Sequence, residues 1–395
     1  RRHSAALSRN MMRTKMDDPK TMTSSLLDKA RRVADLASFA KNIYLTRAHP
    51  VSFVHFVTNR CNARCDFCFI DFDDPATRVG ELTLDEIDRL SRTLGPNLKN
   101  VNLTGGEPFA RKDMTEIARL YLRNTNVESL FITTNGSLPD RIQSFIADLQ
   151  TEFPDRKLIF SFSIDALGQK HDEIRKIDGL FESCLESFRI TRNSGPNVFG
   201  NISITVSADN RDEAVETYEA LIHEHGVDAM TAVIVRDAGV YKTPEPVKQG
   251  IQAAYAEVTR RIVRDLKSGR LAGYNDETLQ GRLMNRKNEI MYDVIKDMYL
   301  APEYISPCHA GSLFGIMAHN GDVHPCEILD KPMGNLRDWN MDWMALWNGP
   351  AAQETRAFIR DTKCHCTYEC AWSFNILANY RYLPRMAAAG LKAGR

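Results

Sequence analysis

Residues 61–68 have the sequence CNARCDFC and place three cysteines, Cys61, Cys65 and Cys68, in a CxxxCxxC pattern. The pattern directly follows a β-rich run from Val51 to Val57, so we expect it on the loop after a strand. Three thiolates can bind three irons of a 4Fe-4S cube and leave the fourth iron open to a non-protein ligand. The triplet therefore predicts a reactive iron-sulfur cluster.

A zinc site is the alternative reading of these cysteines. Structural zinc normally takes four ligands from nearby positions. No further Cys or His lies close behind Cys68. His55 precedes the loop on the strand itself, where we expect it to be a residue of the barrel. The cluster is therefore the favoured interpretation.

Short β-rich runs alternate with helical patterns between residues 51 and 235, which is typical of repeated βα units around a parallel sheet. Helical periodicity is seen, for example, at Leu84, Ile87, Leu90 and Leu94. Strands are predicted at residues 51–57, 101–103, 129–133, 157–163, 201–207 and 230–235. We expect an α/β fold, a partial (βα)6 TIM-like barrel, whose chemistry gathers at the carboxyl ends of its strands.

Polar motifs follow three of these strands. Gly105-Gly106-Glu107 ends the second, in the stretch LTGGEP, where glycines allow close backbone approach and the carboxylate can accept from an ammonium group. Asn135 follows the third strand. Ser163 ends the fourth, and Arg175, which offers a planar fork to a carboxylate, comes shortly after it.

Together with the cysteine triplet, these motifs resemble those of the radical S-adenosylmethionine (radical SAM) superfamily. The resemblance implies that S-adenosylmethionine chelates the open iron and lies with its adenine near Phe67. It also implies that Gly105, Gly106 and Glu107 receive the amino group of S-adenosylmethionine. Ser163 and Arg175 would hold its carboxylate, with Asn135 nearby. In this family, reductive cleavage of S-adenosylmethionine yields a 5′-deoxyadenosyl radical that abstracts hydrogen from a substrate.

A second group of cysteines lies near the end of the sequence. Cys308 and Cys326 form a C-x12-G-x4-C pattern, which resembles the opening of the SPASM and twitch domains that carry auxiliary 4Fe-4S clusters. Cys364, Cys366 and Cys370 follow. Five thiolates cannot fully ligate two cubes, so we expect one auxiliary 4Fe-4S cluster, held by Cys308, Cys326, Cys366 and Cys370, with Cys364 as the fifth candidate. A zinc site helped by His309, His324 and His365 is the alternative.

These patterns divide the chain into four predicted parts. They are an N-terminal helical extension (1–48), the radical SAM barrel (49–240), a helical bridge (241–304) and a SPASM/twitch-like domain (305–395). In the extension, residues 24–43 have the spacing of an amphipathic helix that we expect to pack against the main domain. Residues 253–267 predict a long helix, followed by a polar bridge to Ser306 that we expect near the barrel mouth.

Composition narrows the partners and the location. Basic and acidic residues are equal in number, 51 each, so no overall positive field would attract nucleic acid. No apolar run is long enough to span a membrane. Eight of the nine cysteines fall into the two groups, which favours metal binding in a reducing, cytoplasmic compartment; Cys184, the ninth, is expected in the core.

The substrate class depends on weaker arguments. Relatives with SPASM or twitch domains include peptide maturases and sugar oxidoreductases, and the residues before the first strand look too few for a leader-peptide-binding domain. We therefore expect oxidation or rearrangement of a small-molecule or sugar-like substrate, with an electron donor such as flavodoxin or ferredoxin. Modification of a ribosomal peptide or protein is the first alternative. The second is a non-catalytic zinc or electron-transfer protein.

Overall fold

The computed structural model describes residues 36–273 and 278–390, which fall into two compact units. The first unit ends at Thr46. Its described part is a helix over residues 36–41 that continues as a π-helical turn, η1 (Asn42–Thr46). Residues 24–35 of the predicted amphipathic helix lie outside the described residues. The second unit begins at Arg47 and contains both cysteine groups.

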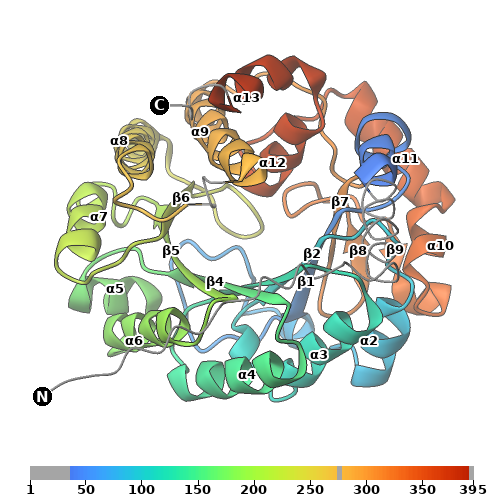
Figure 1. Cartoon of the computed structure of the whole chain (residues 1–395), viewed down its shortest axis with the longest axis horizontal. Helices are drawn as coiled ribbons and strands as arrows, with labels where there is room; N and C mark the ends of the chain where they lie inside the picture. Colours follow the sequence, from blue (N-terminus) through green and yellow to red (C-terminus); the bar gives the residue numbers. More distant parts are fainter. Residues whose placement is uncertain (1–35, 274–277, 391–395) are drawn as a thin grey trace, which may run out of the picture. The chain divides into compact units, whose positions relative to one another are not determined.

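The second unit is built on one sheet in which the first six strands are parallel and follow one another in space (Figure 1). These strands are β1 (Ser52–Thr58), β2 (Asn100–Gly105), β3 (Ser129–Thr134), β4 (Lys157–Ser163), β5 (Val198–Val206) and β6 (Met230–Ile234). Strands β6 and β9 form the two edges, so the barrel is open. The predicted partial βα barrel is confirmed, and its strands lie within a few residues of their expected positions.

Helices connect the strands and cover the outside of the sheet (Figure 1). They are α2 (Leu84–Ser91), α3 (Met114–Asn124), α4 (Pro139–Glu152), α5 (Gly168–Arg175), α6 (Leu180–Asn193), α7 (Ala214–His223) and α8 (Lys248–Lys267). Local sequence defines their ends. Thr83 and Glu86, for example, form a reciprocal capping box that satisfies free amides at the start of α2.

The core lies between the sheet and these helices. Every residue of β1 is buried, because β1 has a neighbouring strand on each side and is covered on both faces. Aromatic rings fill the space under β4, where Phe160 stacks on Phe162 with ring centroids 5.8 Å apart. His55 is fully buried and shares a hydrogen bond of 2.9 Å with the hydroxyl of Tyr121, so it is a barrel residue as expected.

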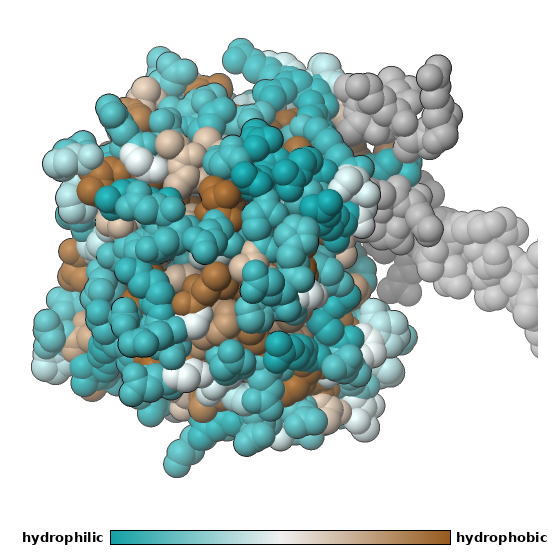
Figure 2. All heavy atoms as spheres, turned by 90° about the vertical axis from the view of Figure 1, so that its left-hand side faces the viewer, coloured by the Kyte–Doolittle hydropathy of each residue, from teal (hydrophilic) through white to brown (hydrophobic). Residues whose placement is uncertain are grey.

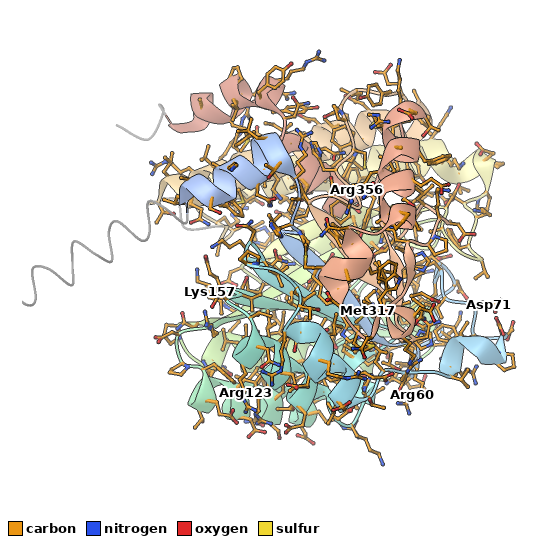
Figure 3. All side chains as sticks on the ribbon, turned by 90° about the vertical axis from the view of Figure 1, so that its right-hand side faces the viewer. Arg60, Asp71, Arg123, Lys157, Met317 and Arg356 are labelled. Atoms are coloured by element: carbon orange, nitrogen blue, oxygen red, sulfur yellow. The ribbon has the colours of Figure 1, made fainter. Side chains whose placement is uncertain are left out.

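The C-terminal part extends the same sheet, which the sequence did not predict. Strand β7 (Phe314–Met317) pairs parallel with β1, and β8 (Asp322–His324) and β9 (Gly334–Asn335) follow as antiparallel strands. The second cysteine group is therefore attached directly to the barrel. Within the C-terminal part, Arg356, labelled in Figure 3, donates to the backbone carbonyls of Gly311 and Trp347 and so holds these segments together.

Helices complete this C-terminal part. They are α9 (Leu279–Leu300), α10 (Trp343–Trp347), α11 (Pro350–Asp361), α12 (Glu369–Leu377) and α13 (Leu383–Gly390). The predicted helix at residues 253–267 is the larger part of α8. Most of the polar stretch expected after it forms a second helix, α9, which buries one face that includes Ile290, Ile295 and Met298.

Short helical turns complete the secondary structure of the described residues. They are η2 (Pro75–Arg78), η3 (Pro108–Ala110), η4 (Glu245–Val247), η5 (Leu336–Trp339) and η6 (Tyr380–Tyr382).

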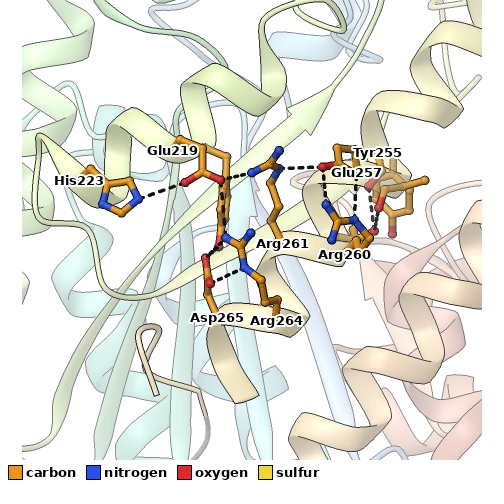
Figure 4. A network of polar contacts seen from close by, with 11 residues as sticks. Glu219, His223, Tyr255, Glu257, Arg260, Arg261, Arg264 and Asp265 are labelled. Carbon is orange, nitrogen blue, oxygen red and sulfur yellow. Dashed lines mark hydrogen bonds and ion pairs between the residues drawn. The ribbon is translucent and has the colours of Figure 1, made fainter. Parts of the chain in front are cut away.

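The outer surface of α7 and α8 is polar. Figure 2 shows this side of the molecule as mainly hydrophilic, with small separated hydrophobic areas. Glu219 of α7 accepts from Arg261 of α8, and thus joins the two helices (Figure 4). Within α7, Glu219 also accepts from His223, and within α8, Arg264 pairs with Asp265. None of the helices in the described part of the chain combines the length and apolar composition that crossing a bilayer demands.

Candidate functional site

A cavity of about 340 Å³ opens at the carboxyl ends of the parallel strands. The cysteines of the triplet, Cys61, Cys65 and Cys68, all line it, on the loop that follows β1. Figure 3 marks the start and end of this loop with Arg60 and Asp71. Other predicted residues share the cavity wall: Phe67, Gly105, Gly106, Asn135, Ser163 and Arg175. The structure thus brings most of the predicted site together.

Backbone contacts hold the cysteine loop in place. The amide of Cys68 donates to the carbonyl of Cys65 at 3.1 Å, and the amide of Arg64 donates to the carbonyl of Arg175 at 3.0 Å. The thiol of Cys61 accepts from the amide of Ala63 at 3.3 Å. The loop is therefore shaped by its own backbone and by the end of α5.

The GGEP turn presses against the same loop. Gly106 donates its amide to the carbonyl of Thr58 at 2.8 Å, and Glu107 donates its amide to the carbonyl of Arg60 at 2.9 Å. A Cβ at Gly106 would lie 2.4 Å from the carbonyl oxygen of Arg60, which leaves no room for any side chain. Glycine is needed here for close backbone approach.

Glu107 has a different position from the other predicted residues. It is fully buried, and its carboxylate already accepts bonds from the amide of Phe109, the hydroxyl of Thr134 and the amide of Asn135. Burial raises its pKa, and these hydrogen bonds oppose the rise. The carboxylate therefore joins the turns after β2 and β3, while Gly105 and Gly106 face the cavity.

Arg175 is held in place by a buried carboxylate. Its Nε and Nη2 atoms lie 2.8 and 2.7 Å from Oδ2 of Asp165, and both side chains are almost completely buried. Burial lowers the pKa of Arg175, but the charge and hydrogen bond of Asp165, together with the charge of nearby Cys65, outweigh burial, and the net pKa is raised. The guanidinium also lies over the ring of Phe67, with its carbon 5.8 Å from the centroid. The pair thus fixes a cationic fork in the cavity wall.

Two further side chains support this region. His171 is buried, and its Nδ1 accepts from the amide of Asp165 at 3.1 Å, which fixes the turn after β4. The side-chain amide of Asn135 donates to Asn62 within the cysteine loop at 2.9 Å. Ser163 lies at the end of β4 in the cavity lining.

The chemistry of the triplet fits an iron-sulfur cluster. Burial raises the pKa of Cys61 to about 12 and also raises the pKa values of Cys65 and Cys68. Iron binding supplies the charge that such thiols need in order to be deprotonated. The open space in front of them leaves room for a non-protein ligand on a fourth iron.

The second cysteine group gathers beside β1 and β7. Cys326 is buried, and its thiol accepts from the amide of Leu329 at 3.3 Å. The thiol of Cys366 accepts from the amide of Tyr368 at 3.5 Å. An apolar cluster that includes Phe314 surrounds the group. Backbone N–H···S bonds in an apolar environment are a suitable setting for a cluster, because both tune the charge on the sulfurs.

The three histidines of the zinc alternative, His309, His324 and His365, take part in no three-ligand metal site within the described residues. His309 is buried and its Nε2 has no hydrogen-bond partner, while Nδ1 of His365 lies 2.9 Å from the carbonyl of Lys363. Within the described residues, no group of three or more His, Cys, Asp or Glu is arranged to hold a single metal ion.

A second part of the cavity wall was not assigned from the sequence. Arg236, just after β6, has Nη1 3.0 Å from Oε2 of Glu327 and 3.9 Å from Oε2 of Glu369. The shorter contact is an ion pair without good hydrogen-bond alignment. Tyr368 donates its hydroxyl to Glu327 at 2.7 Å and stacks under the guanidinium. All four side chains, together with Cys370, line the cavity.

Burial and charge compete in this group. Burial lowers the pKa of Arg236, but the combined charges of the neighbouring groups, Glu327 first and then Glu369, outweigh burial, and the net pKa is raised. Burial raises the pKa of Glu369. A sequence signal did exist, since each glutamate is adjacent to a cysteine of the second group, Cys326 or Cys370. Both glutamates lie far from Arg236 in the sequence, so no local pattern predicted these ion pairs.

An open parallel βα barrel with a cysteine triplet at its carboxyl edge defines an iron-sulfur protein of the partial-barrel class. The family comparison is more specific. Residues 56–221 match the radical SAM superfamily, and residues 308–371 match an iron-sulfur cluster-binding domain, SPASM. The chain therefore contains a radical SAM domain and a C-terminal SPASM domain. These domains imply a 4Fe-4S cluster with S-adenosylmethionine and an auxiliary iron-sulfur cluster.

Curated relatives are similar over part of their length. A GTP 3',8-cyclase of Rhodopseudomonas palustris is 32% identical over 163 residues, which are 40% of this chain and 45% of that protein. A probable GTP 3',8-cyclase of Metallosphaera sedula is 27% identical over 53% of this chain and 63% of its own length. The chain thus spans less than two thirds of each of these relatives.

Solved structures share the fold over most of this chain. Native anSMEcpe with bound AdoMet superposes with a TM-score of 0.57 at 16% identity, over 87% of this chain and 100% of that one. SuiB of Streptococcus suis bound to the precursor peptide SuiA has a TM-score of 0.53 at 15% identity, over 89% of this chain and 75% of that one. At this level of identity, the likeness concerns the fold.

Proposed function

We propose that this radical SAM enzyme abstracts a hydrogen atom from a small polar molecule bound in the central cavity, in an oxidation or a rearrangement. One observation carries the proposal: the cysteine triplet and a group of charged side chains from the C-terminal domain line the same cavity of about 340 Å³. When bound, the first cluster and S-adenosylmethionine supply a 5′-deoxyadenosyl radical, a species able to attack unactivated carbon.

The chain's own residues would bind and orient S-adenosylmethionine. The backbone of Gly105 and Gly106 faces the cavity and is suited to the amino group, since no side chain blocks its approach. Arg175, locked by Asp165, would pair with the carboxylate. Ser163 would support the same carboxylate, and Phe67 would contact the adenine. Glu107 would act through the backbone, by fixing the GGEP turn.

The charges of the cavity indicate the kind of substrate. Its lining arginines, Arg175 and Arg236, are each already paired with a carboxylate. The group around Arg236 contains one more carboxylate than guanidinium. Such a wall would repel a triphosphate and attract an amine or a neutral hydroxylated molecule. We therefore propose a small amino- or hydroxyl-bearing substrate.

Hydroxyl groups would add hydrogen-bonding capacity. Ser161, Ser203 and Thr205 also line the cavity, and each can both donate and accept. Such side chains suit a sugar-like molecule with several hydroxyls. Apolar residues such as Val233 and Ile234 also line the cavity and would exclude water from the reacting centre.

The similar proteins indicate a second candidate for the class of substrate. SuiB was solved with a precursor peptide, so a peptide substrate is the alternative for this chain. GTP 3',8-cyclases are named for a nucleotide, which the paired arginines disfavour here. We further propose that flavodoxin or ferredoxin donates the electron and that the protein works in the reducing cytoplasm, where its thiols stay reduced.

Deuterium transfer tests the proposal. The reduced enzyme would be incubated with S-adenosylmethionine and deuterated amino sugars, neutral sugars, GTP or short peptides, and the 5′-deoxyadenosine analysed by mass spectrometry. We expect deuterium from an amino sugar or a neutral sugar, and none when Cys65 is replaced by Ala. Transfer from a peptide or from GTP alone would refute the proposed substrate class.

A further inference from the structure

Five cysteines compete for four ligand positions on the auxiliary cluster that the SPASM domain implies. All five lie within the described residues: Cys308, Cys326, Cys364, Cys366 and Cys370. Sequence spacing favours Cys366 and Cys370 for the last two positions. The surroundings of each thiol in the structure favour a different set of four ligands.

Four of the thiols lie close enough to interact electrostatically with one another. The thiol of Cys308 interacts electrostatically with Cys366, Cys364 and Cys326. Cys366 interacts in turn with Cys326 and Cys364. These four therefore form a mutually close set, as ligands of a single cube must.

Cys370 has other neighbours. It belongs to the first turn of α12, and its thiol is hydrogen-bonded to the side chain of Tyr368. Its charged neighbours are Glu327, Arg236 and Glu369. Of the five cysteines, Cys370 alone lines the central cavity that the radical SAM triplet also lines.

Backbone hydrogen bonds agree with this division for three of the four thiols, all except Cys364. Cys308, Cys326 and Cys366 each accept a bond from a backbone amide a few residues further on, as Cys61 does in the first group. Such bonds stabilise negative charge on cluster-bound sulfur. The partner of Cys370 is instead a side chain that also reaches Glu327 in the cavity wall.

We propose that Cys308, Cys326, Cys364 and Cys366 hold the auxiliary cluster, and that Cys370 is a free thiol in the wall of the substrate cavity. With Arg236, Glu327 and Glu369, this thiol forms the surface that a substrate would contact. Cys370 is thus a substrate-positioning residue for an amine- or hydroxyl-bearing molecule. The ligand assignment depends on the SPASM domain and not on the identity of the substrate.

Iron retention tests the assignment without turnover. In a background with Cys61, Cys65 and Cys68 all replaced by Ala, the remaining iron belongs to the auxiliary cluster. After anaerobic reconstitution, we expect Cys370→Ala to keep about four irons per chain and the electron paramagnetic resonance signal of its parent. Cys364→Ala should lose iron or give a changed signal, because one iron of the cube would then lack its thiolate. Cys184→Ala, which removes a buried cysteine outside both groups, is the matched control and should match the parent.

Cys370→Ser guards against a folding defect in the alanine variant. Loss of the iron in both Cys370→Ala and Cys370→Ser would overturn the proposal, as would retention of the full iron content and signal in Cys364→Ala. Either result can be distinguished from failure of the proposed substrate class, because reconstitution needs no substrate.

Discussion

Replacing Gly106 by Ala should damage radical formation by a purely steric route. The new Cβ would lie 2.4 Å from the carbonyl oxygen of Arg60, whereas ordinary contacts begin at 3.4 Å, so the two segments must separate by about 1 Å. Arg60 directly precedes Cys61, and the shift would pass into the cysteine loop. A misplacement of about 1 Å can cost roughly 100-fold in rate. We therefore expect about a 100-fold slower formation of 5′-deoxyadenosine.

The assay is single-turnover cleavage of S-adenosylmethionine by reduced enzyme, followed by chromatography of 5′-deoxyadenosine. Iron content is measured in parallel, to separate loss of the cluster from loss of rate. Gly226→Ala is the control, because a Cβ there meets nothing within 4 Å. It adds only local backbone strain, since Gly226 has a positive φ of 68°. Wild-type cleavage by Gly106→Ala would refute the close-approach argument.

Three further predictions concern the scaffold of the site. Tyr218→Phe removes a hydroxyl that donates to the buried carboxylate of Asp265 at 2.8 Å. It should lower the free energy of unfolding, measured in urea, by about 1.5–3 kcal/mol. An unchanged midpoint of urea unfolding would contradict this. Burial and the nearby Arg175 lower the pKa of His171 to about 2, so below pH 6.5 the unfolded chain binds a proton that the folded chain does not. The free energy of unfolding should then fall as the pH is lowered. His171→Gln should reduce the slope of this free energy against pH, between pH 6.5 and 5, by up to about 1.4 kcal/mol per pH unit. An identical slope in the variant and the wild type would count against a buried neutral histidine. Asp165→Asn leaves Arg175 without its buried partner and should lower the free energy of unfolding by about 3–5 kcal/mol. Asp66→Asn breaks an exposed pair with Lys176 and should change the unfolding midpoint far less. Equal effects of the two substitutions would exclude the buried-pair explanation.

Sequence reasoning located the first half of the site because its residues follow strands directly. In a parallel sheet, the carboxyl ends of all strands lie at one edge, and a barrel curls that edge round, so Cys61 after β1 and Ser163 at the end of β4 were expected in one cavity wall. Glu107 shows the limit of this argument. Its place after β2 was predictable, but the three donors that hold its carboxylate come from the details of two turns.

The second half of the site depends on contacts across a long sequence separation. Strand β7 has only four residues, too few for a clear alternating pattern, yet its pairing with β1 brings the C-terminal cysteines to the barrel. Arg236 meets Glu327 and Glu369 only as a result. No local pattern marks such a contact, although the position of each glutamate beside a cysteine could have suggested it.

The central claim is that the triplet of the first cysteine loop generates a radical from S-adenosylmethionine. The most direct test compares 5′-deoxyadenosine formation by the reduced, reconstituted enzyme with that of Cys65→Ala, with Cys184→Ala as the control cysteine variant. The account predicts that the wild type and Cys184→Ala form 5′-deoxyadenosine and that Cys65→Ala forms none. Cleavage by Cys65→Ala at the wild-type rate, or no cleavage by the fully reconstituted wild type, would contradict it.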